Sequence, residues 1–183
     1  MISSRTLFIL FNFIGFQIVW AACAYGAINQ LPFLGVVVGI IYILIHFIFS
    51  PSKQLDLIIM FVVAITGIIL DTANLYIGLL SFGYDTNMLP FWLAILWFSF
   101  SLILPHSLYW LSKFPLLAVI FGGLGGAGTY YIGHQLGAIS LSTPLYPSLI
   151  AYCLEWAIIV PAALWLISML NKSLEGKSYA RSS

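Results

Sequence analysis

The chain has 183 residues, of which 62% are hydrophobic and only 6% are charged, with a formal net charge of +1. A soluble domain carries about 25% charged residues, so this composition excludes a water-facing surface over most of the chain. The near-neutral charge also excludes nucleic acid as a partner, because nucleic-acid binding requires a basic face. A transmembrane helix needs about 20 apolar residues, so the length accommodates about six helices in a single domain.

The apolar segments predict an all-α bundle of six transmembrane helices in one transmembrane domain, 1–170. Clusters of Asn, Gly, Pro and Lys separate the segments and set their limits. Pro105 and Pro161 fall inside expected helices and predict kinks, because proline lacks the N–H that a helix needs. The expected helices run over 6–28, 32–50, 55–82, 90–111, 115–136 and 146–170, followed by a short polar tail over 171–183.

The basic residues predict the orientation of this bundle. They precede the first helix, occupy alternate loops or follow the last helix, whereas the other three loops contain no Lys or Arg. Under the positive-inside rule, this pattern places both termini and the polar tail in the cytoplasm. The basic residues are Arg5, Lys53, Lys113, Lys172, Lys177 and Arg181.

The first apolar segment has two interpretations. Arg5, an apolar run and Ala22-Cys23-Ala24 together are similar to a secretory signal peptide with its cleavage site. The run is longer than an ordinary signal-peptide core, and Asn12 and Gln17 interrupt it, so we expect an uncleaved first helix. Loss of this segment would leave the loop charges unchanged, so the charge pattern does not decide between the two.

The third expected helix carries a carboxylate in the middle of an apolar run. Gly67, Asp71, Asn74 and Gly78 follow the spacing i, i+4, i+7 and i+11, which places them on one helical face. Polar side chains at the depth of the bilayer are costly, and each is therefore a candidate for function. Only neighbouring protein or trapped water could satisfy Asp71 there.

A second acid lies at a similar height in the sixth helix. The rise per residue places Glu155 near the level of Asp71, with Tyr152 on the same face, and Gln17 of the first helix near the midplane. The two acids form either a proton or cation site or a pair of neutral acids that fix helix packing. The candidate residues for binding a substrate or an ion are Asp71, Asn74, Glu155, Tyr152 and Gln17.

The histidines are secondary candidates. His134 lies one turn from Tyr130 in the fifth helix, and His106 groups by height with Asn12 and His46 nearer the cytoplasm. Three histidines on three helices could bind a metal or haem, but no helix has a His-x-x-x-His pair, so we predict neither a metal site nor a cofactor. The two cysteines of the chain form no CxxC pair and are expected to be small apolar residues inside helices.

The fifth helix is rich in glycine. Its match to G-x-G-x-x-G lacks the preceding strand of a dinucleotide site and is a false positive. Gly122 and Gly126 form a G-x-x-x-G pair, and Gly133 begins another, so we expect these three residues to let helices pack closely. The same helix is a candidate surface for a homo-oligomer or a membrane-protein partner. The alternative is an unwound segment that exposes backbone to a substrate.

Several apolar and glycine motifs together resemble a protein family. The motifs lie at residues 12–20, 67–71, 90–97, 106–111 and 133–138. They resemble a family of uncharacterised bacterial inner-membrane proteins, catalogued as a domain of unknown function, over nearly the whole chain. The resemblance implies a small multi-pass protein of the bacterial cytoplasmic (inner) membrane, surrounded by membrane lipids and without an established activity.

Three functions fit these observations. A small transporter or permease component would use the polar cluster to bind a cation or a polar headgroup. A non-catalytic scaffold or assembly protein would use the fifth helix as an interface. An intramembrane lipid-modifying enzyme would use Asp71 or Glu155 as acid or base, with His106 or His134 as partner. We favour transport, with the scaffold and the enzyme as alternatives, and the chain lacks a nucleophile elbow, HExxH and a Walker lysine.

Overall fold

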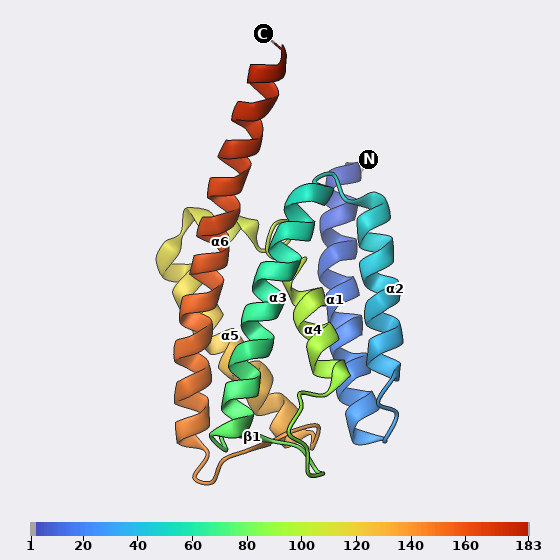
Figure 1. Ribbon diagram of the computed structural model, residues 1–183, viewed down its shortest axis with the longest axis vertical. Helices are drawn as coiled ribbons and strands as arrows, with labels where there is room; N and C mark the ends of the chain where they lie inside the picture. Colours follow the sequence, from blue (N-terminus) through green and yellow to red (C-terminus); the bar gives the residue numbers. More distant parts are fainter. Residues whose placement is uncertain (1–2, 183) are drawn as a thin grey trace.

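The computed structural model describes residues 3–182, with side chains described through residue 173. This part of the chain confirms the all-α prediction, since it contains six α-helices, a short 3₁₀-helix and one two-stranded sheet (Figure 1). The elements in order are α1 (Ser4–Ile28), α2 (Leu34–Phe49), α3 (Lys53–Tyr76), β1 (Leu80–Ser81), α4 (Phe91–Ser101), η1 (Tyr109–Lys113), α5 (Pro115–Gln135), β2 (Ser140–Leu141) and α6 (Tyr146–Ser182).

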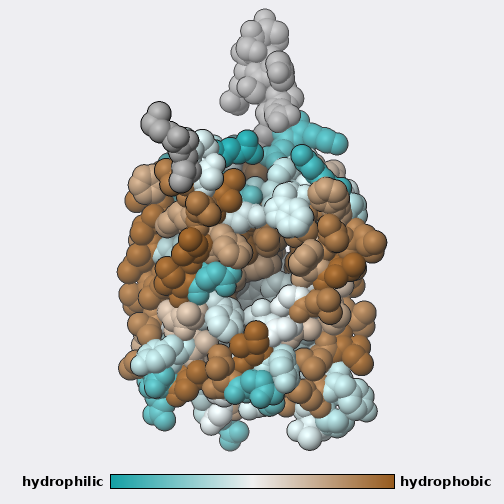
Figure 2. All heavy atoms as spheres, turned by 180° about the vertical axis from the view of Figure 1, so that it is seen from behind, coloured by the Kyte–Doolittle hydropathy of each residue, from teal (hydrophilic) through white to brown (hydrophobic). Residues whose placement is uncertain are grey.

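The exterior of the bundle is suited to lipid. Large apolar side chains are exposed along all of the long helices, among them Leu44, Ile69, Leu124 and Ile158, which are each at least 60% exposed. A soluble monomer rarely exposes so extensive an apolar surface. Figure 2 shows that apolar residues dominate the middle of one face, whereas hydrophilic residues gather toward its ends. Helices α1, α3, α5 and the 146–173 part of α6 are long and apolar enough to cross a membrane. The chain is therefore built as a membrane protein.

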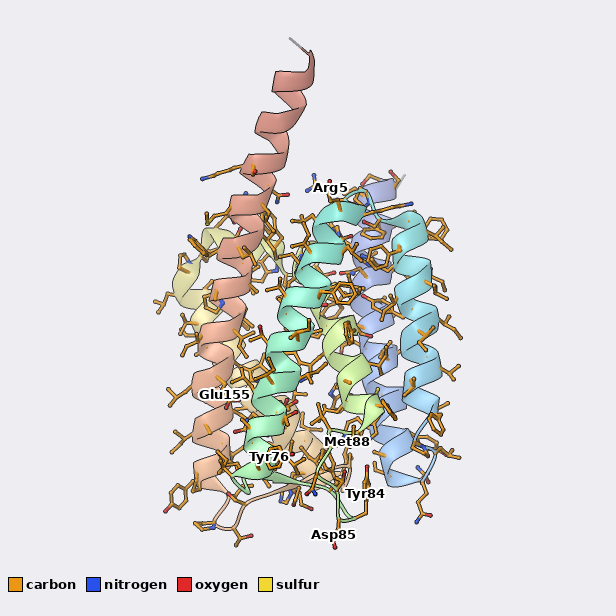
Figure 3. All side chains as sticks on the ribbon, in the orientation of Figure 1. Arg5, Tyr76, Tyr84, Asp85, Met88 and Glu155 are labelled. Carbon is orange, nitrogen blue, oxygen red and sulfur yellow. The ribbon has the colours of Figure 1, made fainter. Side chains whose placement is uncertain are left out.

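Both ends of the described chain lie at the same end of the bundle (Figure 1). Arg5 lies at that end, whereas Asp85 lies at the opposite end (Figure 3). Helix α3 begins at Lys53 and helix α5 begins just after Lys113, and both of these helix ends lie at the same end of the bundle as Arg5. The predicted basic residues Lys177 and Arg181 fall outside the residues whose side chains are described.

The third helix is shorter than the predicted range of 55–82. Gly78 has φ +77, the left-handed conformation that ends helices, and α3 stops at Tyr76. The Leu79 amide donates to the Asn74 carbonyl and the Gly78 amide donates to the Leu75 carbonyl, as in a Schellman cap. Gly78 therefore does not share the helical face of Asp71, and the chain turns into β1, which pairs with β2.

The fourth helix ends much earlier than the predicted residue 111. Helix α4 stops at Ser101, and residues 102–108 form turns before η1. Pro105 cannot donate a backbone hydrogen bond, which explains why the helix does not continue. Non-helical backbone at membrane depth must be buried in protein, and Leu102 and Leu104 are both fully buried. The Asn12 amide donates to the Leu102 carbonyl at 3.0 Å and satisfies an acceptor freed by the break.

Helix α5 is continuous through its glycines, so the alternative of an unwound segment is wrong. Gly122 and Gly126 face α6 of the same chain, where added Cβ atoms would meet the backbone or side chain of Trp156. The packing role predicted for these glycines is thus filled within the chain. A Cβ placed on Gly133 would lie 3.4 Å from Ile139, an ordinary contact with the segment between α5 and β2, and would meet no other helix within 4 Å, so the close helix packing expected at Gly133 is not found.

Candidate functional site

Asp71 lies in the interior of the bundle and is held by side chains from two other helices. Its side chain is 1% exposed. Trp97 Nε1 of α4 donates to Asp71 Oδ2 at 2.6 Å, and the Tyr130 hydroxyl of α5 lies 2.7 Å from both carboxylate oxygens. The Trp97 ring can approach because Gly67, one turn before Asp71, has no side chain in its way.

Two aromatic pairs fix these donors. The rings of Trp97 and Trp156 stack with centroids 4.8 Å apart and an interplanar angle of 17°. Those of Tyr130 and Tyr152 stack with centroids 3.7 Å apart and an angle of 15°. Because Trp156 and Tyr152 both lie on α6, this helix supports both hydrogen bonds to Asp71.

Glu155 forms a separate contact with α3. Asn74 Nδ2 donates to both carboxylate oxygens of Glu155 at 3.0 Å. Glu155 is half-buried and also lines a groove between α3 and α6 that contains Thr66. The structure therefore brings Asp71, Asn74, Glu155 and Tyr152 into one region, as their predicted heights allow.

The remaining sequence candidates lie elsewhere. Gln17 lines a cavity and forms no hydrogen bond with either acid. The Nδ1 atom of His134 accepts the Leu141 amide at 3.3 Å, which ties α5 to β2. His106 belongs to a second polar cluster nearer the chain termini. None of these positions decides what the residues bind, and their functional roles stay predictions.

The Tyr152 hydroxyl is the one buried side-chain polar atom without a hydrogen-bond partner in the described part of the chain. Leaving such a group unpaired costs about 1–3 kcal/mol. We therefore expect Tyr152→Phe to leave the free energy of unfolding in detergent unchanged, or to raise it by up to about 1 kcal/mol. Tyr130→Phe is the control, and because it removes a donor from buried Asp71 it should lower that free energy by about 1–3 kcal/mol. The opposite order of the two variants would contradict this view of the site.

A cavity of about 460 Å³ adjoins the Asp71 site. Its walls come from α1, α4, η1, α5 and α6, and Figure 2 shows a hollow near the middle of the face opposite the view of Figure 1. Trp97 and Tyr130, the two residues that hold Asp71, line it, and Gln17 lines the α1 side. A mostly apolar cavity with a few convergent polar groups is the usual form of a small-molecule site.

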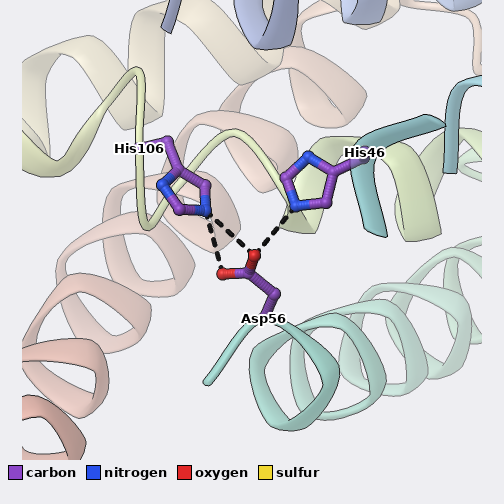
Figure 4. Close-up of side chains that lie close together, drawn as sticks. All are labelled: His46, Asp56 and His106. Atoms are coloured by element: carbon purple, nitrogen blue, oxygen red, sulfur yellow. Dashed lines mark hydrogen bonds and ion pairs between the residues drawn. The ribbon is translucent and has the colours of Figure 1, made fainter. Parts of the chain in front are cut away.

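The second cluster joins His46 of α2, Asp56 of α3 and His106 of the 102–108 turns (Figure 4). The Nε2 atom of His46 lies 2.9 Å from Asp56 Oδ2, and that of His106 lies 2.9 Å from Oδ1. The Ser50 hydroxyl also donates to Asp56. His46 and Asp56 are fully buried. This cluster joins α2, α3 and the turns that follow α4.

Two imidazoles and a carboxylate have the donor types of a divalent metal site, and their ligand atoms lie within 4.8 Å of one another. The contacts of Asn12 argue against that use in this packing. Its Nδ2 donates to the Leu102 carbonyl and its Oδ1 accepts the Ser107 hydroxyl at 2.5 Å, so the amide orientation is fixed. Nδ2 also lies 3.2 Å from His46 Nδ1.

The orientation of Asn12 selects one tautomer of His46. The Asp56 carboxylate accepts from His46 Nε2, so Nε2 carries a hydrogen, whereas Nδ1 faces the Asn12 amide nitrogen, which only donates and also lies near the Tyr42 hydroxyl. A metal on Nε2 would require the hydrogen on Nδ1, where no acceptor faces it. The cluster is therefore best described as a hydrogen-bonded link between helices.

Sequence reasoning grouped Asn12, His46 and His106 by height but missed Asp56, which joins them. Asp56 occupies the first turn of α3, where an acid is ordinary because it interacts favourably with the helix dipole. The available signal was its closeness to the His46 end of α2 across a loop of only a few residues. The sequence likewise presents Tyr130 only as a neighbour of His134 and does not predict its contact with Asp71.

A sequence model of a protein family described as "Protein of unknown function (DUF2878)" matches residues 9–162 of the chain. Neither a curated protein nor a solved structure matches the chain.

Proposed function

Because the chain belongs to the DUF2878 family, whose function is unknown, we propose a function from the site itself: the protein is a small carrier for a lipid-like molecule. The molecule binds in the cavity, with its apolar part against the aromatic walls. Its polar end lies toward Tyr130, and Asp71 supplies the ionisable group behind that wall.

One observation carries this proposal. Trp97 and Tyr130 line the cavity and also hold Asp71 through hydrogen bonds of 2.6 and 2.7 Å. A change in the charge of Asp71 must therefore alter two residues that a bound molecule would touch. Transport needs such a link, because a carrier has to bind its cargo in one state and release it in another.

The two other functions receive less support. The lipid-modifying enzyme requires a histidine beside the bound molecule. His46, His106 and His134 do not line the cavity, so none of them is placed to act on that molecule together with Asp71. Gly122 and Gly126 are covered by α6 of the same chain, so a scaffold interface would need another face of α5.

Two glycines of α5 offer a matched test of the cavity. A Cβ at Gly125 or at Gly128 meets nothing within 4 Å, but only Gly125 lines the cavity. We expect Gly125→Leu to fill part of the cavity and to lose co-purifying lipid, whereas Gly128→Leu retains it. Both substitutions increase helix propensity equally, so folding is matched. Native mass spectrometry of the detergent-purified protein measures the bound lipid. Equal lipid content in both variants would contradict the proposal.

The carrier operates in the bacterial inner membrane with six crossings and cytoplasmic termini. The basic residues support this orientation, and residues 102–113 complete a fourth crossing that the short helix α4 cannot make alone. We expect a membrane-impermeant maleimide to label Asp85→Cys in whole cells, and Ser3→Cys only after lysis. The background carries Cys23→Ala and Cys153→Ala. Labelling of Ser3→Cys in whole cells would reverse the assigned orientation.

A further inference from the structure

The lining of the cavity selects against charged ligands. Among its residues, all within the described part of the chain, none is Lys, Arg, His, Asp or Glu. A phosphate group bound away from bulk water is stabilised by a cationic partner, and this lining offers none. Its possible donors are neutral, because they are the indoles of Trp20, Trp92, Trp110 and Trp156 and the Gln17 amide, whereas Thr129 and Cys23 already donate to backbone carbonyls. The cavity thus fits an uncharged lipid that offers oxygen to Gln17 and Tyr130.

The hydrogen bonds of Asp71 allow two proton arrangements. Trp97 Nε1 only donates, so Asp71 Oδ2 must accept in both of them. When Asp71 is ionised, it also accepts the Tyr130 hydroxyl. When Asp71 is neutral, its proton lies on Oδ1 and is donated to the Tyr130 oxygen, so the hydrogen of the tyrosine is released to another acceptor. Tyr130 lines the cavity, where a ligand oxygen can provide that acceptor.

The same contacts disfavour a metal cation as the coupling ion. A hard cation such as Ca²⁺ or Mg²⁺ requires oxygen ligands with free lone pairs. The Asp71 carboxylate faces an N–H and an O–H donor, and both oxygens of Glu155 face the amide nitrogen of Asn74. These donors suit a carboxylate that gains and loses a proton.

From this geometry we infer that the cavity binds an uncharged lipid with a carbonyl or hydroxyl oxygen, and that its binding is linked to uptake of one proton by Asp71. The ligand oxygen accepts from Tyr130 while Asp71 donates its proton to the Tyr130 oxygen. The O–H bond of Asp71 is the one bond that forms and breaks, because the proton comes from water when the lipid binds and returns to water when it leaves. The inference rests on the proposed lipid-binding function and specifies its ligand class and coupling.

Several groups around Asp71 could share this proton. Tyr130 approaches from α5, Tyr152 and Glu155 from α6, and α4 contributes Trp97, which does not titrate. Asn74 of α3 holds Glu155 rather than Asp71. Glu155 is therefore the competing proton acceptor, and the experiment has to separate the two acids.

The test uses two photoactivatable lipids with identical diazirine-bearing acyl chains: a diacylglycerol and a phosphatidic acid. The full-length protein in nanodiscs is titrated with each probe from pH 5.5 to 8.5, and labelled peptides of α5 are quantified. We expect the half-saturating concentration of the diacylglycerol to rise with pH by up to about tenfold per unit, as for one linked proton. The phosphatidic acid should need at least about tenfold more probe at every pH.

Three variants assign the proton. Asparagine reproduces neutral Asp71, because its oxygen can accept from Trp97 and its amide can donate to Tyr130. Asp71→Asn should therefore bind the diacylglycerol at all pH values as the wild type does at low pH. Tyr130→Phe should bind more weakly and without pH dependence, whereas Glu155→Gln should retain the wild-type pH profile.

The outcomes separate the inference from the function on which it rests. If Gly125→Leu does not reduce labelling, the proposed cavity itself is overturned. If Gly125→Leu reduces labelling but labelling of the wild type is independent of pH, only the proton link is overturned. Equal labelling by phosphatidic acid would overturn the ligand class. Loss of the pH profile in Glu155→Gln, but not in Asp71→Asn, would move the proton to Glu155 and overturn the assignment to Asp71.

Discussion

Asp56→Ala is expected to lower the free energy of unfolding by about 3–5 kcal/mol, the largest single-residue loss at a polar position in this bundle. The substitution removes the acceptor shared by His46, His106 and Ser50, and it leaves two buried donors and the partly buried His106 without this partner. Unpaired donors in a buried site keep the full cost of their desolvation. Asp56→Asn retains one acceptor oxygen and should lose less.

Equilibrium unfolding of the detergent-purified protein measures this loss. Asp85→Ala provides the control, because Asp85 is an exposed acid in the loop at the opposite end and should change the free energy of unfolding by no more than about 0.5 kcal/mol. A loss for Asp56→Ala as small as that of the control would mean that the cluster does not hold the helices together. A gain in stability on addition of Zn²⁺, absent from His46→Ala, would instead favour a metal site.

The Asp56 cluster also illustrates where sequence reasoning stops. Rise per residue and the basic loops placed Asn12, His46 and His106 at one level, and the structure does bring Asn12 and His46 within 3.2 Å. The sequence does not distinguish Asp56, which completes the cluster, from an acid that merely interacts with the helix dipole in the first turn of α3. Its identification requires knowing that the end of α2, the start of α3 and the turns after α4 meet at one point.

At the Asp71 site, too, the sequence predicts the height and face of a residue but not its partners on other helices. Spacing along α3 correctly places Asp71 and Asn74 on a buried face, since both are at most 2% exposed. Periodicity gives the face and height of a residue but not its neighbours on other helices. The donors Trp97 and Tyr130 come from α4 and α5, and the break in α4 depends on Pro105 together with Asn12 of α1. The predicted third helix runs to residue 82, because the sequence pattern does not show that Gly78 adopts the left-handed conformation that ends the helix earlier.

Gly126→Ala is expected to lower the free energy of unfolding by about 1–3 kcal/mol, whereas Gly125→Ala, one residue earlier, should raise it by up to about 1 kcal/mol. Both changes improve helix propensity by the same amount. At Gly126 the new methyl group overlaps the indole ring of Trp156, whereas at Gly125 it enters open space. Trp156 cannot yield freely, because its ring is stacked on Trp97, which donates to Asp71.

The difference between these two variants tests how α5 is used. Unfolding in detergent gives their relative stability, and tryptophan fluorescence reports whether the Trp156–Trp97 pair has moved. If the glycines serve packing within the chain, Gly126→Ala destabilises the monomer itself and shifts the fluorescence. A Gly126→Ala protein as stable as Gly125→Ala, but unable to form an oligomer that the wild type forms, would instead assign this face to a partner. We expect Gly126→Ala to destabilise the monomer, because Gly126 packs against Trp156 of the same chain. Trp156 stacks on Trp97, which in turn holds Asp71.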